Sequence, residues 1–364
     1  MTRPVLERAK LEAVPLPASV VRASVARIAD FDGAMVAPLE RAEWATGDYV
    51  VAVVVEAEHG AHAIESTNGR PVEMIVDDAL VGALGVRSAT LEAVGDWRCV
   101  GEDLRLEALT RAGVLGRVTS ATPQARPLLV PLRYRGHVVR DGRKLTMSDF
   151  VTPVEARRLT APVVLVIGTS MSAGKTTTVI TIVRRLRRLG LRVAGTKVTG
   201  VARYREILAM GDAGADPVVD FVDAGLPSTI CPPEEYQRAL DHLLSRLAAG
   251  EPDAVVVECG SSPLEPYNVD LAVATLRANV CGTVLCASDP YAVVGVASAF
   301  DAVPDLVAGK ATSTSAGISL CQRLAGVRAL NLLDHESHEE LDSLLLEWIL
   351  RRRPLSTSSP ALCN

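Results

Sequence analysis

The residues best suited to chemistry lie in the segment GTSMSAGKT, at positions 168–176. Small residues let successive backbone N–H groups turn toward phosphate oxygens, and a helix N-terminus behind them adds partial positive charge. In a loop of this kind the lysine, here Lys175, reaches the β- and γ-phosphates of a nucleotide. The hydroxyl of the next residue, Thr176, binds Mg²⁺. The segment therefore predicts a phosphate-binding loop.

The spacing of the two glycines departs from the common form of this motif. That form has four residues between its glycines, whereas Gly168 and Gly174 enclose five. A strand-to-helix turn that binds no ligand is the alternative interpretation. We favour the phosphate-binding loop because the Lys-Thr pair follows the second glycine directly. The residues expected to bind the nucleotide are Gly168, Thr169, Ser170, Ser172, Ala173, Gly174, Lys175, Thr176 and Thr177.

The segments on either side of the loop fit a strand and a helix. Residues 163–167 are apolar and mostly β-branched, and after Thr177 apolar residues recur at helical spacing up to Leu189. From residue 162 onward, strand-like and helix-like segments alternate, which predicts a mostly parallel sheet with helices on both faces. The sequence therefore predicts an α/β fold of the P-loop NTPase type. Among its elements we expect a helix between Pro232 and Gly250, a strand over 327–334, and a terminal helix from 338 onward.

Two further charged residues follow strand-like segments. LRVAGTK ends at Lys197, and PDAVVVE ends at Glu258. In open α/β sheets ligands bind beyond the carboxyl ends of the strands. We therefore expect Gly168, Lys197 and Glu258 to converge on one crevice.

The N-terminal part, residues 1–150, contains short β-branched runs separated by turn signals, which predicts a smaller β-rich domain. Residues 140–143, Arg-Asp-Gly-Arg, are typical of a hairpin turn. We expect this domain to serve substrate specificity or interaction. A P-loop domain over 160–350 and a tail over 351–364 would follow it, with the boundary between the two domains at about 147–162.

Composition narrows the functional classes. The net charge of −5 argues against a general nucleic-acid binder, because such proteins need clustered cations. No apolar run approaches the roughly 20 residues of a membrane helix, and the first residues lack a signal-peptide apolar region. We therefore expect a cytoplasmic protein that binds neither nucleic acid nor membrane. The seven cysteines lack zinc-ligand spacing, so we expect buried free thiols.

Three motifs together resemble the dethiobiotin synthetase family. GTSMSAGKT is similar to that family's loop of the form GTDTxVGKT, which has the same five-residue gap between its glycines. LRVAGTKVTG resembles its second strand, of the type YRTAGYKPVxSG, and PDAVVVECGSS resembles its DWVLVEGAGG. The resemblance covers roughly residues 160–335 and leaves the first 150 residues unexplained.

The resemblance implies roles for individual residues. Lys175 and Thr176 would bind the phosphates of ATP and Mg²⁺, Lys197 would lie beside the carbamate or phosphate being transferred, and Glu258 would be a metal ligand. The family also uses an aspartate as a metal ligand. Asp212 and Asp216 both fall near its expected spacing, and we prefer Asp212.

The sequence also departs from the family's pattern. Cys259 and Ser261 stand in the loop that helps to contain substrate, and Thr312 and Ser313 replace the Asn-Asp element that reads the base. In addition, DPVVDFVDAG at 216–225 is similar to a bacterial two-domain P-loop family that includes proteins associated with N-acylation of D-glutamate.

These observations predict a Mg²⁺- and ATP-dependent ligase or kinase that phosphorylates a carboxylate or carbamate of a small molecule, with a carboxylate or an amine as its substrate. A nucleotide-binding switch or a GTPase for cofactor assembly is one alternative, although no NKxD guanine-reading element is found. A coenzyme A-dependent N-acyltransferase is the other alternative. Because dethiobiotin synthetases are dimers, the resemblance also implies a homodimer, which a monomeric mass at micromolar concentration would contradict.

Overall fold

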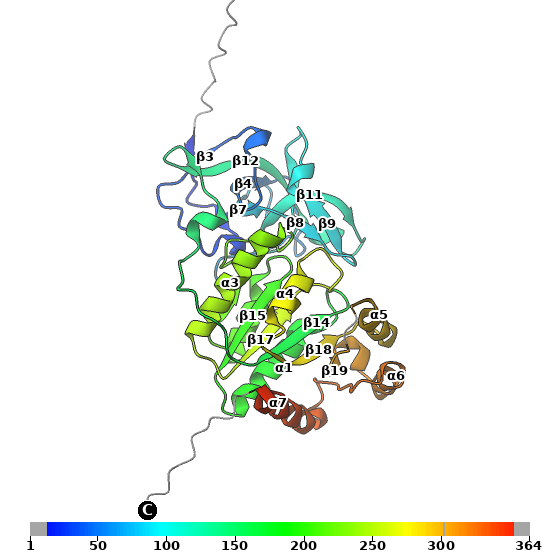
Figure 1. The fold of residues 1–364 in the computed structure, drawn as a ribbon. Helices are drawn as coiled ribbons and strands as arrows, with labels where there is room; N and C mark the ends of the chain where they lie inside the picture. The colour runs from blue at the N-terminus through cyan, green and yellow to red at the C-terminus, as the bar shows by residue number, and fades with distance from the viewer. Residues whose placement is uncertain (1–12, 301–302, 353–364) are drawn as a thin grey trace, which may run out of the picture. The chain divides into compact units, whose positions relative to one another are not determined.

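The computed structural model describes residues 13–300 and 303–352 (Figure 1). The described residues form two compact units, one within Met1–Arg87 and Ala93–Val151, and the other within Ser88–Glu92 and Thr152–Asn364. Residues 353–364, most of the predicted tail, lie outside the described residues, whereas Arg351 and Arg352 belong to the last helix.

The first unit is β-rich. Its main sheet has 11 strands that pair mostly antiparallel, and β5 and β6 form a separate pair. The strands are β1 (Val14–Pro15), β2 (Val21–Arg22), β3 (Met35–Ala37), β4 (Tyr49–Val54), β5 (Ala63–Glu65), β6 (Pro71–Glu73), β7 (Ala79–Leu84), β8 (Val86–Ser88), β9 (Ala93–Asp96), β10 (Arg105–Ala108), β11 (Val114–Ala121), β12 (Val130–Arg140) and β13 (Arg143–Lys144). Short 3₁₀ helices lie at η1 (Ser24–Ala26), η2 (Arg41–Glu43), η3 (Trp97–Cys99), η4 (Arg126–Leu128) and η5 (Met147–Phe150).

The long strand β12 shows why these residues form strands. Leu132 and Tyr134 are buried, whereas Arg133 and Arg135 between and beside them are exposed, so the period of two matches one buried and one solvated face. At its end β12 pairs antiparallel with β13 across the residues Asp141 and Gly142, which both have positive φ (52° and 75°). Left-handed backbone at both central residues suits a tight hairpin. The hairpin predicted at 140–143 is confirmed.

The second unit is an α/β domain around a six-stranded parallel sheet, in the order β16-β15-β17-β14-β18-β19. Its strands are β14 (Val163–Gly168), β15 (Val193–Thr199), β16 (Val218–Asp220), β17 (Ala254–Cys259), β18 (Val280–Cys286) and β19 (Leu306–Ala308). Its helices are α1 (Lys175–Arg188), α2 (Tyr204–Asp212), α3 (Pro233–Ala249), α4 (Val269–Leu276), α5 (Pro290–Phe300), α6 (Ser315–Ala325) and α7 (His338–Arg352), with 3₁₀ turns η6 (Lys310–Thr312) and η7 (His335–Ser337). The predicted α/β fold is confirmed.

Helices cover both faces of this sheet. The helices α1, α2 and α7 pack on one face, and α3 and α4 pack on the other, where Figure 1 shows them in front of the strands. The sequence of α1 explains its place, because Val179, Ile182, Val183 and Leu186 form one buried apolar stripe at helical spacing. Because this stripe packs against the sheet, the loop that precedes α1 is held in a fixed position relative to the sheet.

One predicted strand is wrong. Residues 327–334 form no strand, because only Ala329 pairs with the sheet, through an isolated bridge to Val307. The neighbouring strand β19 has only three residues, and the chain turns again where Asp334 N donates to Asn331 O. The short edge therefore offers too little backbone for a longer pairing. The terminal helix, by contrast, begins at His338 as predicted.

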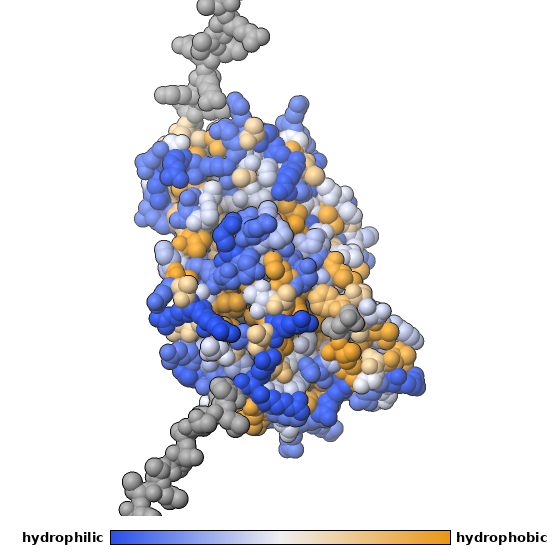
Figure 2. Space-filling view, viewed as in Figure 1, coloured by the Kyte–Doolittle hydropathy of each residue, from blue (hydrophilic) through white to orange (hydrophobic). Residues whose placement is uncertain are grey.

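The helices α5 and α6 pack against each other and leave apolar side chains in solvent. Tyr291, Val294 and Leu324 are exposed. Figure 2 shows an apolar area over this part of the molecule.

A test of the sheet and helix packing is the substitution Gly282→Ala in β18. A Cβ at Gly282 would lie 2.2 Å from the ring of Trp348 in α7, so the helix must shift. Overpacking of this kind costs about 1–3 kcal/mol. We expect a lower urea midpoint, followed by circular dichroism.

The matched control is Gly295→Ala in α5, where a Cβ would meet nothing within 4 Å. Alanine in an open helical position leaves stability equal or raises it, by about 0.5–1 kcal/mol. Equal midpoints for the two variants would contradict the described packing of α7 on β18.

Candidate nucleotide-binding site

The loop between β14 and α1 carries the candidate phosphate site. Strand β14 ends at Gly168 and helix α1 begins at Lys175. Ser172 and Gly174 have left-handed backbone, with φ of 63° and 108°. A serine in this region is strained, and such strain concentrates at ligand sites. The backbone therefore curls as a phosphate-binding loop requires.

Lys175 turns back over this loop. Its side chain is buried, and its Nζ donates to Ser170 O at 2.8 Å. The ammonium group therefore lies within the curve of the loop, where it can reach a phosphate oxygen. Next to it, Thr176 Oγ1 donates to Glu258 Oε1 at 3.5 Å, so the hydroxyl and the carboxylate face each other.

Three charged residues form a row across the neighbouring strands. Lys197 in β15 is in register with Glu258 in β17 and with Asp220 in β16. Residues in register on parallel strands project from the same face of the sheet. All three residues are buried. The structure thus brings Lys175, Thr176, Lys197 and Glu258 to one edge of the sheet, as the sequence predicts.

Electrostatics at this edge favour a bound cation. Burial raises the pKa of Glu258 and the nearby Glu206 carboxylate raises it further, while Lys197 and Lys175 lower it, and the result is a pKa of about 7. The Oε2 atom of Glu258 is buried and has no hydrogen-bond partner among the described residues. A buried carboxylate oxygen without a partner is costly, so a metal ion or its water would satisfy it.

Two acidic residues near Lys197 are absent from the sequence-based prediction. Glu206 Oε2 accepts from Lys197 Nζ at 2.5 Å, and Asp220 lies beside Lys197 in register. Asp220 could have been found by the rule that found Glu258, because it ends the short apolar run PVVD of a parallel strand. No sequence signal marks Glu206, since its place depends on how α2 returns over the sheet.

The structure does not bring Asp212 or Asp216 to this edge, so the metal-ligand prediction for them needs correction. Asp212 is the last residue of α2, about 9 Å along the helix from Glu206 in its first turn. Asp216 N donates to Val193 O at the start of β15. Both aspartates therefore lie toward the amino ends of the strands, away from Thr176 and Glu258.

The other predicted loop residues divide into two groups. Two of them tie the loop to its surroundings: Ser288 N donates to Thr169 Oγ1 at 3.0 Å, and Lys310 N donates to Ala173 O at 3.2 Å. Two leave hydroxyl groups for a ligand. Ser170 Oγ is buried without a partner among the described residues, and Thr177 is exposed.

The segment expected to read the base flanks the loop. A hydrogen bond from Lys310 N to Ala173 O joins this segment to the loop. Thr312 is buried and its Oγ1 donates to Gly309 O at 3.1 Å, so this hydroxyl serves the turn itself, whereas Ser313 is exposed. The geometry therefore leaves Ser313 rather than Thr312 accessible.

The donor set fits Mg²⁺. Within residues 13–300 and 303–352, no group of three or more His, Cys, Asp or Glu side chains could hold a metal ion. Mg²⁺ needs no such cage, because it usually binds one or two protein oxygens and completes its shell with water and substrate phosphates. Thr176 and Glu258 supply that number.

The six described cysteines are free, as predicted. Burial raises the pKa of Cys259, beside Glu258, to about 12, so this thiol stays protonated and unreactive. Cys99 is exposed, contrary to the expectation of buried thiols, and Cys363 lies outside the described residues.

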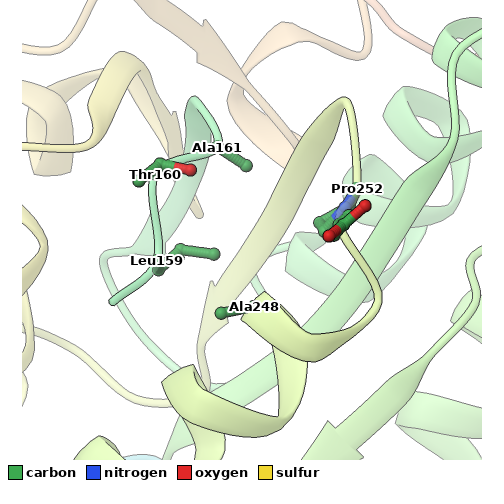
Figure 3. Close-up of a pocket in the computed structure, with 6 residues that line it drawn as sticks. Leu159, Thr160, Ala161, Ala248 and Pro252 are labelled. Carbon is green, nitrogen blue, oxygen red and sulfur yellow. The ribbon is translucent and has the colours of Figure 1, made fainter. Parts of the chain in front are cut away.

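A cavity of about 310 Å³ lies elsewhere in the second unit (Figure 3). Its wall contains Leu159, Thr160 and Ala161 before β14, Ala248 of α3, and Pro252 before β17. These residues precede the amino ends of the strands, so the cavity is at the opposite edge from the loop. It therefore does not belong to the candidate nucleotide site.

Comparisons with known proteins agree with the class of fold. The family model "Domain of unknown function (DUF1611_C) P-loop domain" matches residues 151–323. These residues form a P-loop domain. No curated protein matches the chain. Among the described residues, no helix has the length and apolar character of a membrane span.

Several solved structures are similar to part of the chain, at low identity and low TM-score. A DUF1611 family protein from Anabaena variabilis is 15% identical, with a TM-score of 0.36, over 55% of this chain and 62% of that one. The chain thus spans less than two thirds of that relative. HypB from Helicobacter pylori, in complex with nickel, is 16% identical, with a TM-score of 0.37, over 55% of this chain and 92% of its own. FlhF with GMPPNP and Mg²⁺ is 16% identical, with a TM-score of 0.32, over 48% and 67%.

The raised pKa of Glu258 predicts a pH dependence of stability without metal. Between its ordinary value near 4.5 and about 7 the folded protein keeps a proton that the unfolded chain releases. The carboxyl group therefore contributes less to the free energy of unfolding as pH rises through this range, by up to about 1.4 kcal/mol per pH unit. Glu206, Lys197 and Lys175 all face it.

From pH 5 to pH 7 we expect the free energy of unfolding of Glu258→Gln to rise relative to that of wild type. Above pH 7 this difference should level off. Urea unfolding in EDTA measures it. Glu234→Gln in α3 is measured in parallel as the control, because it makes the same change of side chain at an exposed position. A flat difference for Glu258→Gln would contradict the described environment.

Proposed function

We propose that this protein is a Mg²⁺- and ATP-dependent enzyme that transfers the γ-phosphoryl group to a carboxylate or carbamate of a small molecule, as a ligase or kinase. One observation carries the proposal. Two buried lysines, Lys175 at the end of the loop and Lys197 in β15, both lower the pKa of the Glu258 carboxyl group electrostatically. The same carboxyl group also contacts Thr176. Two cations and a metal-binding pair at one edge suit a highly charged phosphoryl group.

The proposed step needs little covalent chemistry from the protein. A carboxylate oxygen of the acceptor forms a bond to the γ-phosphorus, and the bond from that phosphorus to the bridging oxygen breaks. The catalyst's task is to align the two oxygens and to neutralise charge. Lys175 would contact the β- and γ-phosphates, and Lys197 would contact the transferred group from the acceptor side.

Thr176 and Glu258 would hold Mg²⁺. When bound, the ion neutralises phosphate charge and orients the phosphate oxygens. The Oε2 atom of Glu258, which has no hydrogen-bond partner within residues 13–300 and 303–352, supports this assignment.

In the acyl phosphate formed in this way, phosphate is a good leaving group. An amine could therefore attack the acyl carbon and displace phosphate in a ligase reaction. We propose that the first unit serves substrate specificity or interaction. A homodimer in the cytoplasm also remains a proposal. The homodimer is supported by three exposed side chains, because apolar side chains of this kind are common at interfaces. They are Tyr291, Val294 and Leu324.

Calorimetric binding of ATP, GTP and coenzyme A, with and without Mg²⁺, tests the proposed function. We expect Mg²⁺-dependent binding of ATP to wild type. The substitution Lys175→Ala should weaken it about 100-fold, because hydrogen bonds from a charged donor to phosphate are lost in a buried site.

Arg184→Ala is the control, since it removes a positive charge from an exposed position of the same helix. It should bind ATP as wild type does. Preference for GTP would support a nucleotide switch instead. Binding of coenzyme A without binding of nucleotide would point to acyl transfer and contradict the proposed reaction.

A further inference from the structure

The ammonium group of Lys197 is surrounded by Gly260, Phe221, Val201 and Glu206, and we call this space the slot. Gly260 forms one wall, because a Cβ at that position would lie 2.5 Å from Lys197 Cε. The ring of Phe221 lies 5.8 Å from Nζ, within range of a cation–π contact. Nζ donates to Val201 O at 3.1 Å and to Glu206 Oε2 at 2.5 Å. The slot is therefore built around a cation with one place for a carboxylate.

Glu206 fills that place from the side nearer to solvent. Its side chain is 18% exposed, whereas that of Lys197 is 5% exposed. Glu206 lies in the first turn of α2, outside the sheet that holds Lys197. Its carboxylate therefore touches the buried ammonium on one side and can be hydrated on the other.

The charge in the slot must be compensated at all times. Burial alone would lower the pKa of Lys197, but Glu206, Glu258 and Asp220 outweigh burial and raise it. The lysine thus remains an ammonium, and an unpaired ammonium at this depth is costly. Only another anion can replace Glu206 at low cost.

We propose that Glu206 occupies the anion position of the acceptor site, and that a carboxylate of the substrate displaces it to bind Lys197. This inference rests on the proposed function and names its acceptor as a carboxylate that enters from the side of α2. The exchange replaces one carboxylate by another, so the charge of the slot is kept, and the released Glu206 gains water. Ser261 follows Gly260, is fully buried, and has an Oγ without a partner among the described residues.

The test is to remove the carboxylate of Glu206 and return it in solution. In Glu206→Ala, sodium acetate should raise the midpoint of thermal unfolding by several degrees, in a saturable way, over sodium chloride of equal concentration. Wild type should respond equally to both salts. The double variant Glu206→Ala with Lys197→Met should lose the preference for acetate.

Glu206→Gln, which keeps the volume of the side chain, is measured in parallel in case the alanine variant does not fold. Its preference for acetate should be smaller but present. The inference is overturned when neither variant distinguishes acetate from chloride, or when the double variant still does.

This assay contains no nucleotide, so it fails or succeeds apart from the proposed phosphoryl transfer. Acetate binding without ATP binding would keep the carboxylate site and remove the proposed reaction. ATP binding without any effect of acetate would do the reverse.

Discussion

The site depends on the compensation of buried charge at the carboxyl edge of the parallel sheet. Lys197 lies in register between Asp220 and Glu258, and Glu206 closes the arrangement from α2. Each of these groups would be unfavourable in the interior without the others. The balance holds three acids and one base in fixed positions beside the phosphate-binding loop, which is the arrangement that a charged ligand requires.

The fold maintains this balance through apolar packing. The buried stripe of α1 fixes the loop against the sheet, and hydrogen bonds of Thr169 and Ala173 join the loop to the segments that follow β18 and β19. Lys175 and Thr176 begin α1, so their side chains are placed by the same packing. Paired charge at the edge and apolar contact below it therefore act together to hold the geometry of this edge.

The sequence predicts those parts of the site that local patterns encode. Strand, loop, Lys175 and helix follow each other directly, and Lys197 and Glu258 are marked because each ends an apolar run. The sequence does not predict the parts that depend on tertiary geometry. Spacing favours Asp212, but α2 carries it away from the edge, and the same helix brings in Glu206, which no pattern marks. Residues 327–334 form no strand, because β19 is too short to pair with them.

The most direct test of the central claim is a crystal structure with Mg²⁺ and a non-hydrolysable ATP analogue. We expect the phosphates in the loop 168–176, with Lys175 Nζ moved from Ser170 O to a phosphate oxygen, and the metal bound by Thr176 Oγ1 and Glu258. Phosphates bound outside this loop, or a metal held by other side chains, would contradict the account.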